Sequence, residues 1–329
     1  MNIIYIFRYP SKERSIERVF DPIMKRMKEM GHEVQADFAY SCRFWPWAMI
    51  KNMLHFARLS RENICHITGD VQYVACFMKP ENTVLTIHDL VSLHNEKTPW
   101  WFRWLVYWLW YYIPLKRLKY ITCISEMTRQ DILSYFPWVE DKIQVICDPV
   151  GDEFQPTPMP ANNIVPQILH IGTRSNKNLC RVIEAMNGLD ASLRIVGRLD
   201  EKQEAMLNNS NIQYSNAFHL SDEDIVHEYQ LCNIVSFPSL FEGFGLPIIE
   251  AQAIGRPVVT SNREPMKSVA ADGCILVNPE SVKSIHEGFK RLLINNNLQQ
   301  QCIDKGYENA KKYSSVTIAS AYEKIYKSM

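Results

Sequence analysis

The sequence has no excess of charge of either sign. Lys and Arg together number 36, and Asp and Glu together also number 36. A protein that binds nucleic acid through bulk electrostatics carries clustered basic residues and a high isoelectric point. We therefore expect no nucleic-acid partner.

The sequence also lacks the cysteine patterns of a secreted or zinc-binding protein. Its nine cysteines are odd in number, form no Cys-x-x-Cys pair, and lie partly within apolar runs. Neither a disulfide framework nor a zinc site follows from that distribution. The segment 1–7 has too short an apolar run and no leading positive region for a signal peptide, so we expect a strand there. These features predict a cytoplasmic protein.

No internal repeat or low-complexity tract is present, and strand and helix patterns alternate throughout the chain. Strands separated by helices are typical of βαβ units, which build parallel sheets. The runs that predict strands lie at 3–7, from 34, and at 64–67, 84–87, 120–124, 143–147, 168–171, 193–196, 234–238 and 257–260.

A proline-rich break divides the chain. Four prolines and a glycine fall within 148–160, which is typical of a linker. The 329 residues are enough for two α/β domains of ordinary size. We therefore expect a first domain at 1–150, a second at 151–306, and a C-terminal helical segment at 307–329.

The most informative stretch is 239–250, a glycine-rich turn between a strand and a helix. Pro247 suits the first helical position, because the N–H it lacks would have no intrahelical partner there. Such a turn directs backbone N–H groups and a helix N-terminus at one point, which favours phosphate. Glu242 and Glu250 flank the turn and can bind hydroxyl groups, so the stretch suits a sugar nucleotide. The alternative is a plain strand-turn-helix whose acids are solvated.

Glu242 and Glu250, with seven residues between them and Gly-Phe-Gly-Leu-Pro inside, resemble the paired-glutamate motif of retaining glycosyltransferases of family 4. The resemblance implies the α/β GT-B fold, in which two Rossmann-like parallel-sheet domains face a central cleft and the C-terminal helix returns to the first domain. It implies that Glu242 lies beside the donor sugar and Glu250 holds the nucleotide ribose. The turn residues that would meet the donor are Gly243, Phe244, Gly245, Leu246 and Pro247.

A second loop, 171–178, also follows a strand and opens a helix. Lys177 resembles the family lysine that binds the donor diphosphate. A cation there stabilises the negative charge that the leaving group gains as the glycosidic bond breaks. The family often places arginine directly after the glycine; here Thr173 stands there, and Arg174 follows as a donor-binding candidate. The alternative is that both basic residues are solvated near a helix start.

The first domain contributes three further candidates. The segment 86–89 resembles the family's Thr-x-His-Asp element, whose histidine, here His88, lies near the donor sugar at the carboxyl end of a strand. A structural histidine is the alternative. Asp70 ends another strand and would meet an acceptor hydroxyl. Relatives often carry a glycine-rich turn after the first strand, where Arg8 or Lys12 would substitute in this chain.

An Asp-x-Asp pattern at 222–224 has the form that a different glycosyltransferase fold uses to hold a metal. Here it follows Ser221 and precedes an apolar run, which indicates a capping box with acids in the first helical turn. Family 4 enzymes generally need no metal. We therefore expect no metal site and no cofactor.

Five of the eight tryptophans lie in 100–119. The segment is interrupted by Arg103 and too short to span a bilayer. Trp and Tyr favour the membrane interface, and the basic residues at 116–119 favour anionic lipid. Either this helix contacts the inner leaflet, which would make the protein peripheral, or it is buried in the first domain.

The resemblance implies a retaining hexosyltransferase that moves a sugar from a UDP- or GDP-sugar to a glycan or lipid-linked acceptor in cell-surface polysaccharide synthesis. One alternative is a GT-B sugar-nucleotide epimerase or phosphorylase, against which the Glu-x7-Glu string argues. Another is a non-catalytic module that binds a nucleotide sugar. Fold alone does not separate them.

Overall fold

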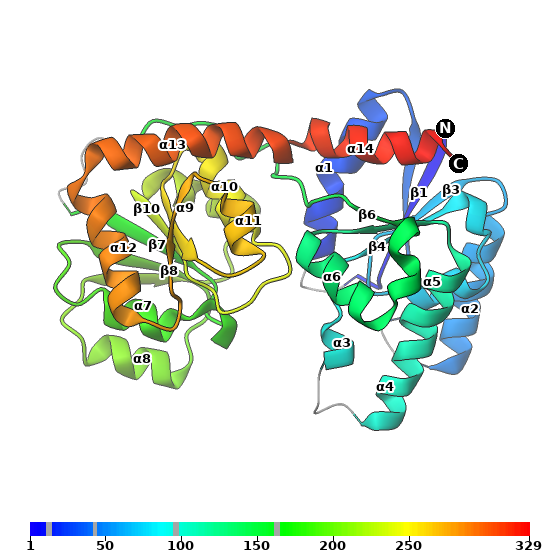
Figure 1. Cartoon of the computed structure of the whole chain (residues 1–329), viewed down its shortest axis with the longest axis horizontal. Helices are drawn as coiled ribbons and strands as arrows, with labels where there is room; N and C mark the ends of the chain where they lie inside the picture. The colour runs from blue at the N-terminus through cyan, green and yellow to red at the C-terminus, as the bar shows by residue number, and fades with distance from the viewer. Residues whose placement is uncertain (11–14, 42–44, 95–98, 161–164) are drawn as a thin grey trace. The chain divides into compact units, whose positions relative to one another are not determined.

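The computed structural model describes residues 1–10, 15–41, 45–94, 99–160 and 165–329. The chain divides into two compact units. The first unit comprises Met1–Pro149 and Ser315–Met329, and the second comprises Val150–Ser314. Each unit is built on a six-stranded parallel sheet flanked by helices (Figure 1). The predicted α/β architecture with two parallel sheets is confirmed. Lys12 lies outside the described residues.

The first sheet has the strand order β2-β1-β3-β4-β5-β6. Every neighbouring pair is parallel. The order reverses between β1 and β3, so loops leave these two neighbours toward opposite sides of the sheet. The strands are β1 (Asn2–Phe7), β2 (Glu33–Phe38), β3 (Ile64–Ile67), β4 (Thr83–Ile87), β5 (Tyr120–Cys123) and β6 (Ile143–Val145).

Helices flank the first sheet and supply much of its core. Ser125 caps α6, since its side chain accepts a hydrogen bond from the Thr128 N–H. The helices are α1 (Ser15–Glu29), α2 (Pro46–Leu59), η1 (Gln72–Cys76), η2 (Pro80–Asn82), α3 (Val91–His94), α4 (Trp100–Val106), the π-helical η3 (Tyr107–Tyr112), α5 (Ile113–Arg117), α6 (Glu126–Tyr135), η4 (Pro137–Lys142) and α14 (Ser315–Lys327).

The tryptophan-rich segment divides into a buried half and an exposed half. Trp110, Tyr111 and Leu115 belong to the hydrophobic core of the first unit. Trp100 and Trp104, in α4, are exposed to solvent. Within the described ranges, no helix combines the length and hydropathy needed to cross a bilayer. Part of the segment is therefore buried in the first unit and part is exposed, so neither a wholly buried helix nor a wholly exposed one describes it.

The last helix, α14, packs on the first unit through buried tyrosines. Tyr326 bonds to His66 Nδ1 at 2.6 Å, and Thr86 Oγ1 lies 2.7 Å from His66 Nε2. Burial lowers the pKa of His66 to about 3, so this histidine is neutral at physiological pH. The helical segment expected from 307 is not one continuous helix: α13 ends at Ala310, a 3-10 turn at Lys311–Tyr313 and the extended residue Ser314 follow, and α14 begins at Ser315.

The second sheet has the order β12-β11-β10-β7-β8-β9, again parallel throughout. The edge strands β9 and β12 are not among the expected strands; β9 is largely polar, whereas β12 is an apolar run of four residues. The strands are β7 (Gln167–Ile171), β8 (Ser192–Val196), β9 (Tyr214–Ala217), β10 (Ile234–Phe237), β11 (Val258–Ser261) and β12 (Cys274–Val277).

Helices of the second unit follow the expected alternation. Ser221 forms a capping box with Asp224 at the start of α9, which confirms that the 222–224 acids belong to a helix cap. The helices are η5 (Ser175–Lys177), α7 (Leu179–Ala185), α8 (Glu201–Asn208), α9 (Asp222–Leu231), α10 (Leu246–Ile254), α11 (Met266–Ala270), α12 (Val282–Ile294), α13 (Asn296–Ala310) and η6 (Lys311–Tyr313).

Candidate functional site

The strand order of the second sheet reverses between β7 and β10, which are hydrogen-bonded neighbours. Ligands of open α/β sheets bind beyond the carboxyl ends of the strands at such a reversal, where adjacent loops part. The loop 172–178 leaves β7 there, and the loop 238–245 leaves β10. The two sequence stretches singled out above therefore meet at one place in the fold.

Lys177 and Glu242 are brought into contact at this place. Lys177 Nζ donates to Glu242 Oε1 at 2.7 Å, and both side chains are mostly shielded from solvent. Lys177 Nζ also lies 4.7 Å from the centre of the Phe237 ring. Asn176 Nδ2 donates to the same Glu242 oxygen at 3.3 Å. The arrangement fixes a cation and a carboxylate side by side, each held by a further neighbour.

The two loops are tied together by their backbones and by Asn178. The Leu240 N–H donates to the Asn176 carbonyl at 2.8 Å. Asn178 is buried in the left-handed conformation, with φ of 67°, and its amide donates to the carbonyls of Pro238 and Pro279. Asparagine tolerates this conformation better than most residues. The position of Lys177 is therefore set by its neighbours in the loop.

The glycine turn forms the start of α10. Gly245 has φ of 114°, a conformation that favours glycine, and Pro247 lies in the first helical turn. Phe244 is buried against the Tyr313 ring, and Leu246 begins the helix. The turn thus anchors one side chain in the core and presents the helix N-terminus, a favourable position for an anion.

Glu250 lies one turn further along α10, where its carboxylate is oriented by a buried phenol. Tyr229 O–H donates to Glu250 Oε2 at 2.6 Å. Burial, together with the Glu250 charge, holds the pKa of Tyr229 well above its usual value, so the phenol stays protonated and remains a donor. A carboxylate with one oxygen fixed in this way has a defined orientation for a hydroxyl-bearing ligand.

Residues around the lysine loop have different roles. Arg174 is exposed at the start of η5. Thr173, which stands where the family often has arginine, donates from Oγ1 to the Arg198 carbonyl at 2.6 Å and so braces the loop. His170 is fully buried behind the loop. Burial first, and then the nearby Lys177 charge, lower the pKa of His170 to about 4, so it is neutral at physiological pH.

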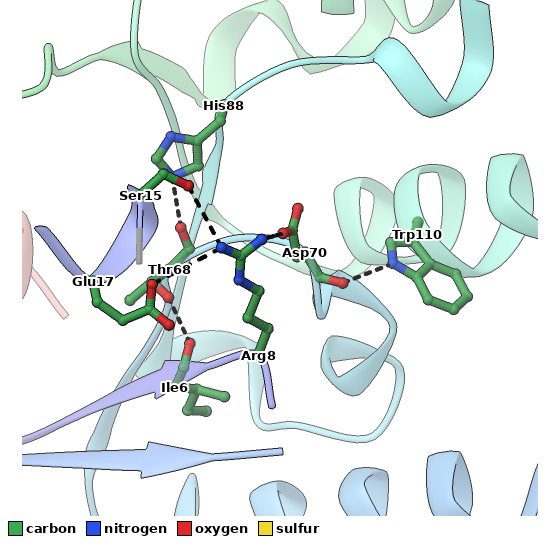
Figure 2. A network of polar contacts seen from close by, with 8 residues as sticks. All are labelled: Ile6, Arg8, Ser15, Glu17, Thr68, Asp70, His88 and Trp110. Atoms are coloured by element: carbon green, nitrogen blue, oxygen red, sulfur yellow. Dashed lines mark hydrogen bonds and ion pairs between the residues drawn. The ribbon is translucent and has the colours of Figure 1, made fainter. Parts of the chain in front are cut away.

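In the first unit, Arg8 and Asp70 join the two strands at the reversal of strand order. Arg8 follows β1, Asp70 follows β3, and Arg8 Nη1 donates to Asp70 Oδ2 at 2.8 Å. Figure 2 shows the Arg8 guanidinium between the carboxylates of Asp70 and Glu17. Asp70 has φ of 59°, and its carbonyl accepts from Trp110 Nε1 at 3.0 Å. These contacts hold the Asp70 backbone in an uncommon conformation.

His88 directly follows β4, beside the same network (Figure 2). His88 Nε2 donates to the Thr68 carbonyl at 2.7 Å, since a carbonyl oxygen can only accept. Gly69, at φ of 143°, leaves room for this ring, because a Cβ there would lie 2.9 Å from His88 Cδ2. The structure therefore places Arg8, Asp70 and His88 in one cluster.

Three residues of these clusters escaped sequence reasoning. Glu17 is 5% exposed, and its Oε2 has no hydrogen-bond partner and lies 4.0 Å from Arg8 Nη2. Asn176 and Tyr229 orient Glu242 and Glu250. For Glu17, the only available signal was an acid at a position of α1 where the helical pattern is buried. Nothing in the sequence distinguishes Tyr229 from an ordinary core residue.

Comparison with known proteins identifies the family. A model of glycosyl transferases group 1 matches residues 155–309, and a model of glycosyltransferase family 4 matches residues 38–154. The serotype-specific mannosyltransferase WbdA of Escherichia coli is 26% identical over 275 residues, which cover 70% of this chain and 33% of WbdA. The chain thus spans about a third of the length of this relative.

Solved structures share the fold over the whole chain. A glycosyltransferase from Rickettsia africae has a TM-score of 0.77 at 20% identity, covering 100% of this chain and 99% of its own. Anabaena HepE in complex with UDP and glucose has a TM-score of 0.78 at 14% identity, with both chains covered in full. These similarities confirm the GT-B fold. Since the two family models together cover residues 38–309, the chain belongs to the glycosyltransferases of family 4.

Proposed function

We propose that this chain is a retaining hexosyltransferase that transfers a sugar from a UDP- or GDP-sugar to a glycan or lipid-linked saccharide during assembly of a cell-surface polysaccharide. The observation that carries the proposal is the contact between Lys177 and Glu242 at the strand reversal, beside a helix N-terminus. Similarity to a serotype-specific mannosyltransferase and to a structure holding UDP and glucose supports the substrate class. Mannose is accordingly the first sugar to test.

The proposed roles follow from charge. When the bond to the anomeric carbon breaks, negative charge grows on the departing diphosphate and positive charge on the sugar. Lys177 would stabilise the diphosphate, with Arg174 and the turn 243–247 as further contacts. Glu242 would face the sugar, where its negative charge opposes the developing positive charge. Because Lys177 now binds Glu242, an arriving diphosphate would share the ammonium with that carboxylate.

The ribose of the donor would be held by Glu250. Tyr229 fixes one carboxylate oxygen at 2.6 Å, so the side chain is oriented before the nucleotide arrives. Pre-orientation lowers the entropy lost when a hydroxyl group is bound. Tyr229 is thus proposed as a positioning residue for nucleotide affinity rather than for the chemical step.

Retention of configuration implies attack from the face that the leaving group vacates. The acceptor oxygen forms a bond to the anomeric carbon, the bond to the diphosphate oxygen breaks, and that oxygen takes the acceptor's proton. Because the departing diphosphate takes the proton, the transfer step needs no base from the protein. We propose that His88, Asp70 and Arg8 of the first unit serve the sugar and the acceptor through hydrogen bonds. The reaction is proposed to need no metal or other cofactor.

We further propose a cytoplasmic protein, peripheral at the inner membrane face through contact of residues 100–119. The competing hypotheses are a GT-B epimerase or phosphorylase and a binding module without turnover. The test is incubation of the purified chain with UDP- and GDP-hexoses, including GDP-mannose, and saccharide acceptors, with NMR of the product's anomeric carbon. A product with the donor's anomeric configuration supports the proposal. Inversion contradicts retention, and nucleotide binding without any turnover favours the binding module.

A further inference from the structure

The chain passes between the two units at two places, and the first of them leads into residues 150–158, which we call the connecting segment. Phe154 of this segment is buried against Tyr229. The two rings meet edge to face, with centroids 5.5 Å apart and planes at 84°. This is a favoured geometry for aromatic pairs. The connecting segment therefore contacts the residue whose phenol orients Glu250.

A buried arginine fixes the other end of the connecting segment. Arg256 is 1% exposed, and its guanidinium donates to the Thr157 carbonyl, the Thr157 hydroxyl and the Pro158 carbonyl, each at 3.0 Å. The Thr157 N–H in turn donates to the carbonyl of Ile254, the last residue of α10, at 3.0 Å. A charged group is costly to bury unless it is hydrogen-bonded, so these contacts favour one position of the segment.

The same guanidinium holds the backbone of Tyr229. Arg256 Nε donates to the Tyr229 carbonyl at 3.1 Å, and Nη2 donates to the Gln230 carbonyl at 2.7 Å. Both carbonyls belong to the last turn of α9, where helical carbonyls lack intrahelical partners. A planar guanidinium can reach several acceptors at once in this way. Tyr229 is thus held at its ring by Phe154 and at its backbone by Arg256.

The second crossing of the chain is bonded to the first. The Val150 N–H donates to the Tyr313 carbonyl at 2.8 Å, and Val150 pairs with Ser314 in a parallel bridge. The Tyr313 ring packs against Phe244 of the glycine turn, with centroids 5.6 Å apart. Each crossing therefore leads to a residue that shapes the candidate nucleotide site, Tyr229 for the first and Phe244 for the second.

We propose that Phe154 is a positioning residue for nucleotide binding, acting through Tyr229 on Glu250, and that Arg256 holds the connecting segment where this action requires it. A hydrogen bond weakens steeply with distance and angle, so a small rotation of the Tyr229 ring would weaken its 2.6 Å contact with Glu250. Phe154 packs on that ring and limits its rotation. The effect on nucleotide affinity rests on the proposed function, but the link from Phe154 to Glu250 does not.

The test is calorimetric titration of UDP and GDP into the native chain, Phe154→Leu, Tyr229→Phe and the double variant. Phe154→Leu should raise the nucleotide Kd by about 2–30-fold, the range for residues that modulate a site without touching its ligand. The donor KM should rise in parallel while kcat changes little. In the Tyr229→Phe background, Phe154→Leu should change the Kd by less than about twofold, because the phenol through which it acts is gone.

Two control variants separate positioning from packing. Phe154→Tyr keeps the aromatic ring and should retain the native Kd. Phe289→Leu makes the same exchange in another core cluster, which among the described residues includes none from α9 or α10, so it should lower stability without changing the Kd. A native Kd in a Phe154→Leu variant that circular dichroism shows to be folded overturns the proposal. So does a Kd raised equally by Phe289→Leu, or an effect of Phe154→Leu that persists undiminished without the phenol.

A measurement without nucleotide tells failure of this proposal apart from failure of the proposed function. Urea unfolding of Tyr229→Phe, Glu250→Gln and their double variant gives the interaction free energy between the two side chains, and the cycle is repeated with Phe154→Leu present. The interaction should shrink in that background. An unchanged interaction overturns the positioning role even if the native chain transfers sugar. A reduced interaction in a chain that binds neither UDP nor GDP supports the positioning of Glu250 and contradicts the proposed function.

Discussion

Lys177 Nζ lies 2.7 Å from Glu242 Oε1, although the two residues are 65 positions apart in the chain. They follow β7 and β10, neighbours at the point where the strand order reverses. Each charge holds the other in place. Removing either side chain leaves a partly buried charge without its partner, which is unfavourable for folding and, if the proposed roles hold, for catalysis.

Lys177→Met should lower kcat/KM for sugar transfer by about 10²–10³-fold, the range seen when one group that stabilises developing negative charge is removed. Initial rates at varied donor concentration measure this change. Lys202→Met, which alters an exposed lysine of α8, is the control and should leave the rate unchanged. Native kcat/KM in Lys177→Met would remove this lysine from the mechanism.

The ion pair also predicts that substitutions of Lys177 and Glu242 have non-additive effects on the free energy of unfolding. Urea unfolding of the native chain, Lys177→Met, Glu242→Gln and the double variant forms a complete cycle. We expect an interaction free energy of about 0.5–3 kcal/mol, as for residues in direct contact. The double variant should thus be more stable than the sum of the single changes predicts, because it leaves no charge unpaired. Strict additivity would show that the two side chains do not interact in solution.

Tyr229→Phe should weaken nucleotide binding while changing kcat little, because the phenol orients Glu250 and does not touch the reacting atoms in the proposed mechanism. Thermal unfolding with UDP or GDP measures the affinity. A nucleotide at a hundred times its Kd should stabilise the native chain by about 2.7 kcal/mol. Glu250→Ala should lose this stabilisation and Tyr229→Phe should lose part of it. Native stabilisation in both variants would contradict the assignment of the ribose site.

Asp148 gives a pH-dependent prediction independent of catalysis. Burial raises the pKa of this carboxyl to about 6, against an opposing effect of His88. The folded chain then binds the proton more tightly than the unfolded chain, so its stability falls as the pH rises from 3.8 to about 6. Asp148→Asn should be more stable than the native chain above this window, by up to about 3 kcal/mol.

That advantage should shrink toward zero below the window, where the native carboxyl is protonated. Buried His66 and His170, whose pKa values are lowered by burial, destabilise both proteins alike as the pH falls. The difference between Asp148→Asn and the native chain therefore isolates the carboxyl. Urea unfolding at several pH values measures it, and a difference independent of pH would show that Asp148 is not buried as described.

The main strands and the paired glutamates could be predicted because their signals are local. β4 contains the apolar residues Val84, Leu85 and Ile87 and is buried at every position, because both faces of a parallel sheet are covered. The turn before α10 carries its glycines and proline in the sequence itself. The edge strand β9 could not be predicted, because its residues Tyr214–Ala217 are largely polar and pair on one side only. Its conformation depends on β8, a tertiary partner that the local pattern does not contain.

The sequence could not predict which side chains from distant parts of the chain meet in the candidate sites. Nothing in sequence pairs Tyr229 with Glu250, or places Glu17 beside Arg8, because those distances depend on the packing of α9 on α10 and of α1 near β1. The tryptophan-rich segment shows the same limit. Composition indicates an amphipathic interface, but only packing decides that Trp110 is buried and Trp100 is not.

A substitution at Gly172, compared with the same substitution at Gly188, separates an effect on activity from an effect on stability. It has φ of 92°, and a Cβ there would lie 2.8 Å from Lys177 Cγ. Gly188, in the same unit, has φ of 77° with nothing within 4 Å of its added Cβ. Ala at either position should cost about 1–2 kcal/mol of stability from the left-handed backbone.

Only Gly172→Ala should also displace Lys177, so its kcat/KM should fall at least tenfold further than that of Gly188→Ala, as expected when a catalytic cation moves by a fraction of an ångström to an ångström. Urea unfolding and initial rates on the two variants provide the comparison. Equal kcat/KM in both, at equal loss of stability, would mean that the position of Lys177 does not matter to the reaction. Because the two substitutions add the same methyl group in the same backbone region, the difference between them reports the lysine alone.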